Sequence, residues 1–197
     1  MLLKDRAGPL SDQQRRLLEE AEKSCGRLSG IIAEMSDLAN LEAGTASFNR
    51  STVELGTLLE ETIAALPPLP DREVNVKLDN QAGHATVEGD PIRLKTAAAA
   101  VLTALRRELV TSDCLFVRQE SRQNNGKKAW VAIASDAARV VRLGEAREID
   151  LATFDEWRGG CGLSLAIARR LIEAHGGRIW SPVDDTKAGA VIMLPQA

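Results

Sequence analysis

The first quarter of the chain carries its longest regular pattern of apolar and polar positions, and this pattern predicts one long helix. Apolar side chains recur there at alternating steps of three and four, and no proline interrupts residues 10–43. Ser11 and Gln14 form the S-x-x-Q pattern of a capping box at the start, and Gly44 supplies a stop. The stripe consists of Leu18, Ala21, Cys25, Leu28, Ile32, Met35 and Ala39, and Leu38 and Leu41 widen it.

A helix of this length is about 50 Å long at 1.5 Å per residue. Its apolar seam is narrow, so the helix needs a partner of the same kind. We therefore expect it to belong to a coiled-coil or four-helix-bundle dimer. The alternative is a long helix that lies on its own domain.

The remaining residues alternate between helical and strand patterns. Residues 45–54 are expected to be a connector that Phe48 and Val53 anchor. Together the segments predict an α/β two-layer sandwich, with helices against one face of a mixed sheet, preceded by the long helix. Helical spacing covers 55–66, 91–110 after an Asp90-Pro91 cap, and the stretch between the two glycine-rich ends of 159–177. Strand patterns cover 73–79, 84–88, 115–118, 130–134, 178–181 and 190–194.

Residues 137–158 lack clear periodicity over most of their length and hold several charges. Only residues 150–157 form a small helical patch. Segments of this length without regular structure often cover binding sites. We expect a mobile lid here.

A glycine-rich turn runs directly into a helix between Gly159 and Gly177, in the sequence GGCGLSLAIARRLIEAHGG. Gly160, Gly162 and the following backbone can present free N–H groups at the positive end of that helix, where anions such as phosphates bind. The segment therefore predicts a nucleotide site. The alternative is a glycine-capped packing helix without a ligand.

Composition and charge narrow the function classes. A net charge of −3 gives no electrostatic case for nucleic acid or for an anionic membrane. The three cysteines lie far apart and form no C-x-x-C pair, which is typical of a reducing compartment. No apolar run approaches the about 20 residues of a membrane span. We expect a cytoplasmic protein without membrane contact in this chain.

Taken together, the segments resemble the cytoplasmic region of a two-component sensor histidine kinase over nearly the whole chain. Residues 10–44, which end in SDLANLEAG, resemble the second helix of the dimerisation and phosphotransfer hairpin. Residues 48–197 resemble the Bergerat-type ATP-binding domain. The expected division is thus 1–46 for a helical dimerisation segment and 47–197 for an ATP-binding domain.

The order and spacing of several short motifs carry this resemblance. The run from Asp90 to Leu94 is similar to the start of the asparagine box, and Ser135-Asp136 to the first glycine box. Phe154 lies where the family has a lid phenylalanine. Gly160–Leu165 resembles the second glycine box, and EAHGG with a closing strand is also typical of the family.

The resemblance implies ATP and Mg²⁺ as cofactors, a homodimer through the long helix, and the receiver domain of a response regulator as partner. It implies that Asp136 binds adenine, and that the backbone amides of Gly160, Gly162 and Leu163 hold phosphate. The family's phosphoacceptor histidine belongs to the first hairpin helix, which would precede Met1. His84 and His175 are expected to be a surface and a structural histidine, so no catalytic residue is assigned within this chain.

Departures from the family motifs separate two hypotheses. The family's magnesium-binding asparagine falls at Ala104, with Ala100 at the other common position, so no metal ligand is expected. Ala137 and Ala138 replace glycines after Asp136, and Ser164 replaces the third glycine of the second box.

The first hypothesis is a pseudokinase with weak or absent ATP binding, acting as a scaffold or in a phosphotransferase-like role in a phosphorelay. The alternative is the ATP-binding catalytic fragment of an active kinase.

Overall fold

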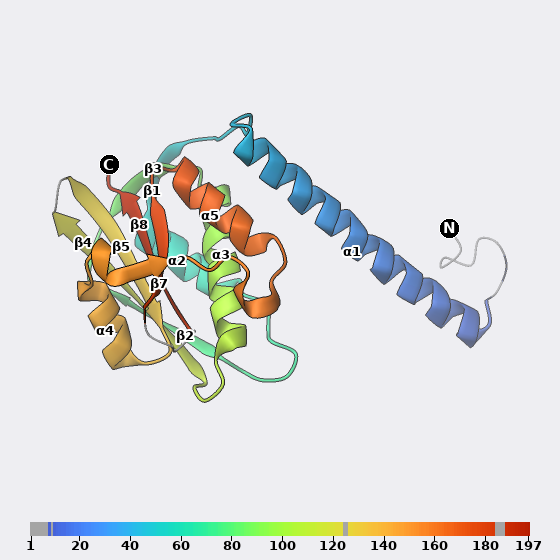
Figure 1. Ribbon diagram of the computed structural model, residues 1–197. Coiled ribbons are helices and arrows are strands. Elements are labelled where there is room, and N and C mark those ends of the chain that lie inside the picture. Colours follow the sequence, from blue (N-terminus) through green and yellow to red (C-terminus); the bar gives the residue numbers. More distant parts are fainter. Residues whose placement is uncertain (1–7, 9, 124–125, 184–187) are drawn as a thin grey trace.

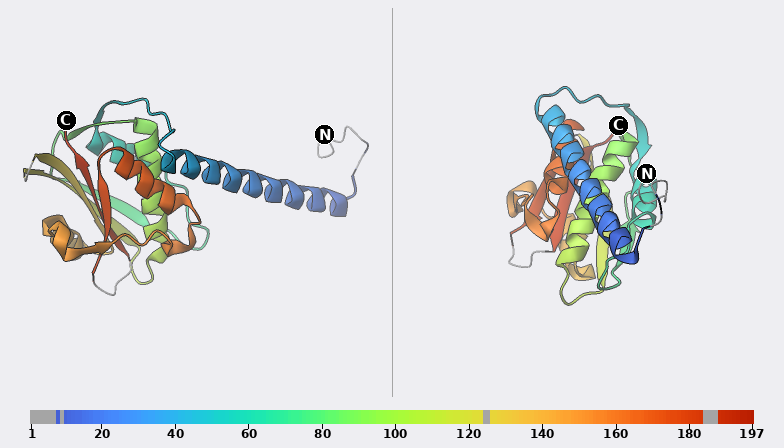
Figure 2. Two further views of the ribbon diagram at one scale, coloured as in Figure 1. Left: turned by 45° about the horizontal axis from the view of Figure 1, so that its top comes forward. Right: turned by 90° about the vertical axis from the view of Figure 1, so that its right-hand side faces the viewer.

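The computed structural model describes residues 8, 10–123, 126–183 and 188–197 of the chain. Its N-terminal part is the predicted long helix, α1 (Asp12–Glu42). The capping box is present, since the Gln14 N–H donates to Ser11 Oγ and the Ser11 N–H donates to Gln14 Oε1. Gly44 adopts a φ of +68°, which ends the helix in the left-handed region that glycine favours. Every residue of α1 is described and none is buried, because most of the helix projects from the rest of the molecule (Figure 1; Figure 2).

A six-stranded mixed sheet organises the rest of the chain, which we call the α/β body (described residues from Ser51 onward). Only β2 and β4 pair in parallel; the other described neighbours are antiparallel. In spatial order the strands are β2 (Asn75–Asn80), β4 (Cys114–Gln123), β5 (Lys127–Ala134), β8 (Gly189–Pro195), β7 (Arg178–Pro182) and β6 (Leu151–Thr153).

A small second sheet corrects one prediction. Residues 51–54 are not connector but strand β1 (Ser51–Glu54), which pairs with β3 (Thr86–Gly89) in antiparallel register. Val53 lies opposite Val87 in this pair, and both are buried. The strand is stabilised by a partner more than thirty residues away, so the local pattern alone did not show it.

Three helices cover one face of the large sheet, as expected for the two-layer sandwich. They are α2 (Leu55–Ala64), α3 (Pro91–Glu108) and α5 (Ser164–Ala174). Their apolar faces meet the sheet in the main core, where Val101, Leu115 and Leu171 are fully buried. The predicted Asp90 cap is present, and its side chain accepts hydrogen bonds from the Ile92 and Arg93 amides.

The opposite face of the sheet carries a further helix where we predicted a mobile lid. Residues 137–145 form α4 (Ala137–Glu145), which packs on β4 and β5 (Figure 2, left). Val140 and Leu143 lie one turn apart and cover Trp130 in a second apolar cluster. The lid prediction is therefore wrong for this segment, because apolar burial fixes it on the sheet.

The predicted helical patch at 150–157 is wrong as well. Residues 151–153 form β6, which pairs with the outer edge of β7. Phe154 follows it and is buried in the main core. The segment thus runs along the sheet edge into a short 3-10 turn, Arg158–Gly160, before α5 begins.

Candidate functional site

The four predicted nucleotide-binding residues lie on two separate elements. Asp136 follows the end of β5, whereas Gly160, Gly162 and Leu163 lie together in the turn before α5. Within the described residues, no hydrogen bond joins Asp136 to that turn. Its carboxylate instead accepts a hydrogen bond from the Arg139 amide at 2.8 Å and so caps the start of α4.

The glycine turn keeps the geometry of an anion-binding loop. Gly159, Gly160 and Gly162 have φ values of +67°, +60° and +60°, a conformation that residues with a β carbon rarely adopt. Leu163 is the N-cap of α5 and makes no side-chain capping bond. The first amides of α5 therefore receive no side-chain cap at its positive end.

The position expected for a magnesium ligand is covered by this same turn. Ala104 is 1% exposed on α3. A β carbon built on Gly159 would lie 3.1 Å from the Ala104 carbonyl oxygen and 3.2 Å from its Cβ. The turn therefore packs directly on Ala104, which supplies no side-chain oxygen to a hard cation. The described residues also contain no cluster of three or more His, Cys, Asp or Glu side chains that could hold a metal ion.

A buried ion pair that sequence reasoning missed lies beside Ala104. Arg158 Nε donates to Glu108 Oε1 at 2.8 Å and Arg158 Nη2 to Glu108 Oε2 at 2.5 Å, in bidentate geometry. The two side chains are only 7% and 9% exposed. Glu108 ends α3, one turn after Ala104, whereas Arg158 begins the glycine turn.

The Arg158 guanidinium also reaches the strands beneath the helices. Its Nη1 donates to the Gly189 carbonyl oxygen at 2.9 Å and to Ser181 Oγ at 3.4 Å. Gly189 pairs with Ala134, which is the last residue of β5 and lies two residues before Asp136. Arg158 thus joins the glycine turn to α3, which carries the predicted metal position, and to strands β7 and β8. A lone arginine ahead of the glycines was the only sequence signal for it.

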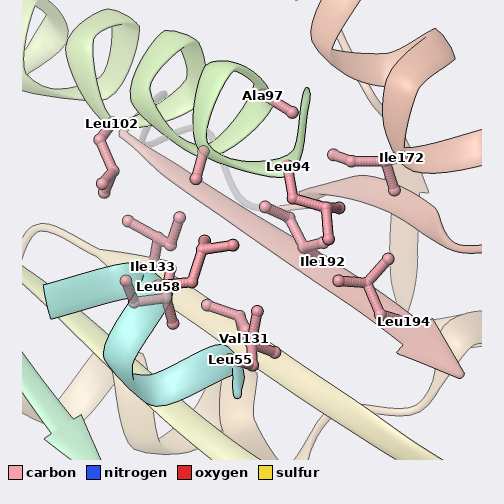
Figure 3. Close-up of a pocket in the computed structure, with 12 residues that line it drawn as sticks. Leu55, Leu58, Leu94, Ala97, Leu102, Val131, Ile133, Ile172, Ile192 and Leu194 are labelled. Atoms are coloured by element: carbon pink, nitrogen blue, oxygen red, sulfur yellow. The ribbon is translucent and has the colours of Figure 1, made fainter. Parts of the chain in front are cut away.

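Four hollows that described residues border lie away from the predicted nucleotide-binding residues. An apolar cavity of about 30 Å³ lies between the sheet and helices α2, α3 and α5. The side chains labelled in Figure 3 line it with hydrocarbon only. Hydrophobic packing accounts for a cavity of this size and lining. Three open hollows of about 520, 230 and 210 Å³ border described residues, and Asp136, Gly160, Gly162 and Leu163 line none of them.

Two buried polar groups near α3 have structural roles. Burial opposes ionisation of Asp90, but backbone N–H groups of Arg93, Asn49 and Ile92 outweigh it and lower the pKa of the carboxyl. His175 Nε2 accepts a hydrogen bond from the Asp90 amide at 3.0 Å, and its Nδ1 lies 2.6 Å from the Leu171 carbonyl oxygen. Both ring nitrogens of this buried histidine are engaged, whereas His84 is exposed.

Comparison with curated proteins relates the chain to histidine kinases. It is 25% identical over 187 residues to the circadian input-output histidine kinase CikA of Synechococcus elongatus, covering 90% of this chain and 24% of that protein. It is 26% identical over 199 residues to the sensor protein GacS of Pseudomonas syringae, covering 95% and 22%. The chain therefore spans about a quarter of the length of these relatives. No protein-family model matches it.

Comparison with solved structures gives the same fold. Full-length ShkA, crystallised in complex with AMPPNP, superposes with a TM-score of 0.70 at 19% identity over 99% of this chain and 41% of that one. The Acinetobacter baumannii histidine kinase AdeS superposes with a TM-score of 0.63 at 18% identity over 98% and 89%. These identities show the fold alone. None of the described helices combines the length and the apolarity that crossing a bilayer demands.

Proposed function

We propose that this chain, which both comparisons relate to the sensor histidine kinases, is a two-component signalling module whose ATP-binding-type domain binds ATP weakly or not at all. It acts as a dimerising scaffold or in a phosphotransferase-like role, and not as the source of phosphoryl groups. The observation that carries this proposal is the packing of the glycine turn on the expected metal position, with a buried ion pair beside it. Gly159 packs on Ala104, and Arg158, which precedes Gly159, pairs with Glu108 one turn after Ala104 on α3.

Phosphoryl transfer from ATP depends on a cation that bridges the phosphates and on fixed positioning of the transferred group. Ala104 offers no oxygen, and the turn above it leaves no room for a longer side chain. The phosphates would therefore have to bind through the glycine turn alone.

A nucleotide whose phosphates drew Arg158 away from Glu108 would leave this carboxylate buried without its partner. Removing one member of a buried ion pair costs about 3–5 kcal/mol. Converted to affinity, that is a loss of roughly two to three and a half orders of magnitude.

Calorimetric titration of the chain with ATP, with and without Mg²⁺, tests the proposal. We expect no heat of binding at millimolar ATP and no effect of the metal. Micromolar affinity that strengthens with Mg²⁺ would refute the proposal. A parallel titration of the Glu108→Leu, Arg158→Met double variant separates the two arguments, since gain of Mg²⁺-independent binding identifies the ion pair as the main obstacle.

A second candidate is the ATP-binding catalytic fragment of an active kinase. The three left-handed glycines and the uncapped start of α5 favour it, because they keep the form of a phosphate-binding loop. In this case Asp136 would bind adenine, and Gly160, Gly162 and Leu163 would hold the phosphates. The same titration decides between the two functions.

The dimeric state is part of the proposal. Large apolar side chains along α1 are 50–66% exposed, at Leu17, Leu28, Ile31, Ile32 and Met35. A seam of this kind on a projecting helix is stabilised by pairing with a second copy. We infer a homodimer through α1, a response-regulator receiver domain as partner, and a cytoplasmic location. Light scattering over a concentration series tests the dimer, and Ile32→Glu should yield monomer whereas Glu20→Gln should not.

A further inference from the structure

The outer strand β6 presents backbone groups that have no partner. Pro182 lies opposite Leu151 in the ladder with β7 and has no N–H, so the exchange of two hydrogen bonds falls on the next pair, at Ala152. Leu151 and Thr153 therefore direct their backbone groups away from β7. The Leu151 N–H donates to the Glu148 carbonyl oxygen. No described residue bonds to the Leu151 carbonyl oxygen or to the N–H and carbonyl groups of Thr153.

Both ends of β6 are fixed, so this edge is preorganised. Before the strand, Arg147 Nε lies 3.0 Å from Asp150 Oδ2. After the strand, Phe154 is buried in the main core, and the Asp155 N–H donates to Ser181 Oγ at 3.2 Å. An added strand would therefore not have to order β6 when it binds.

The two outer strands of the large sheet differ in their protection against pairing. Charged side chains on an edge strand discourage the approach of another strand. Strand β2, at one edge, carries Lys77 and Asp79, whereas β6, at the other edge, reads Leu-Ala-Thr and carries no charge. Beside the start of β6, Ile149 and Val183 are 84% and 69% exposed. Free backbone groups and open apolar surface thus occur together at β6.

An open hollow of about 210 Å³ adjoins the start of β6 on the side of the sheet that α4 covers. It is lined by Arg139, Arg142, Leu143, Asp150, Pro182 and Val183. Leu151 packs with α4 in the second apolar cluster, so a side chain opposite Leu151 on an added strand would point to the same side. Arg142 is exposed and forms no ion pair with a described residue. Its guanidinium is therefore available to a carboxylate.

We propose that the outer edge of β6 is a docking site for an extended segment of another protein, which adds to the sheet as an antiparallel strand and places an acidic side chain on Arg142. Thr153 exchanges two hydrogen bonds with one residue of the segment, and the Leu151 carbonyl oxygen accepts another from the residue two positions further on. The side chain of that second residue points to the hollow and meets Arg142. Backbone pairing supplies affinity, and the carboxylate supplies selectivity. The site uses neither Asp136 nor the glycine turn, so it goes beyond the proposed function and does not depend on ATP.

Selection of random displayed peptides of about ten residues, the upper length of common strands, tests the site on the unaltered chain. We expect enriched peptides to alternate apolar residues and to carry Asp or Glu. Fluorescence polarisation then measures their affinities for variants that circular dichroism shows to be folded. Thr153→Pro removes an outward N–H and leaves the bonds to β7 in place, and it should weaken binding by about tenfold.

Charge reversal at Arg142 keeps the test valid if proline disturbs the strand, because this side chain is exposed. Arg142→Glu should weaken binding by about tenfold or more, since it places two like charges together. A matched control, Arg16→Glu, makes the same charge change on the projecting helix α1 and should bind as the unaltered chain does. Replacing the peptide's Glu with Gln should weaken binding to the unaltered chain but not to Arg142→Ala.

Methylation of peptide nitrogens separates strand addition from other modes of binding. Only alternate residues of an added strand direct their N–H groups at β6. Methyl groups on one set of alternate residues should therefore abolish binding, and methyl groups on the other set should leave it unchanged. Binding that tolerates both sets would overturn the proposal, as would a selection without enriched peptides or full affinity in Thr153→Pro or Arg142→Glu. Self-association of the Ile32→Glu chain that Thr153→Pro abolishes would assign the edge to a second copy and overturn it as well.

Discussion

Replacing Glu108 with glutamine tests the buried ion pair beside the candidate site. The change keeps the shape of the side chain, removes its charge, and places an amide group against the Arg158 guanidinium. Both side chains are less than 10% exposed, so solvent screening reduces their interaction little. Breaking such a pair from one side costs about 3–5 kcal/mol.

The lower end of that range applies to this pair. Arg158 keeps its hydrogen bonds to the Gly189 carbonyl oxygen and Ser181 Oγ when Glu108 loses its charge. We therefore expect the free energy of unfolding to fall by about 3 kcal/mol. For a chain of this size, such a loss lowers the melting temperature by about 6–12 °C. Urea unfolding followed by circular dichroism measures the free energy directly.

Two further variants make the test specific. Glu61→Gln removes the same charge from an exposed pair with Lys95 and should change stability by less than about 1 kcal/mol. The Glu108→Leu, Arg158→Met double variant should regain most of the lost stability, since apolar replacement of a whole buried pair is often neutral. A loss below about 1 kcal/mol in Glu108→Gln would refute the reasoning, because the pair would then behave as a surface pair.

Four other changes probe the backbone and the α3 cap. Gly177→Ala would place Cβ 2.4 Å from the Met193 carbonyl oxygen, and the resulting strain should lower the free energy of unfolding in urea by about 1–3 kcal/mol. Gly162→Ala should lower the free energy of unfolding by about 1–2 kcal/mol because Gly162 has a φ of +60°. Gly26→Ala, in the middle of α1, should raise the free energy of unfolding by up to about 1 kcal/mol. Asp90→Asn should lower the free energy of unfolding most at neutral pH. Burial opposes ionisation of Asp90, but backbone hydrogen bonds to the carboxylate lower its pKa in the folded state. The stability that the charged carboxylate contributes is therefore present above the unfolded pKa of about 3.9 and is lost as pH falls through the lower folded pKa. Unfolding curves at pH 7 and pH 3 should show the difference between this variant and the unaltered chain narrowing in acid.

Local signals predicted the long helix almost to the residue. A capping box, an uninterrupted apolar stripe and a glycine stop all lie within or next to α1, and the helix spans Asp12–Glu42. Strand β1 shows the opposite case. Its four residues carry little pattern of their own, and they pair with β3, which follows along the chain only after helix α2 and strand β2.

Helix α4 could have been predicted from its partner strand. Residues 129–134 of β5 are buried without interruption, whereas a strand covered on one face alternates between buried and exposed positions. Ala129, Val131 and Ile133 belong to the main core, and Trp130 belongs to the second cluster. The continuous apolar run therefore required a second packing element on the opposite face of the sheet. Helix α4 is this element, and Val140 and Leu143 are its apolar contacts.

The candidate site depends on contacts that no local pattern reveals. Arg158 and Glu108 are fifty residues apart, and only the folded chain brings them together. The glycine turn makes this contact possible, since the left-handed Gly159 follows Arg158 directly and lies against Ala104. The glycines thus have a structural task in this chain whether or not a phosphate binds. Their presence is consequently weak support for a nucleotide, and the atoms that surround Arg158 are the stronger argument about the function of the site.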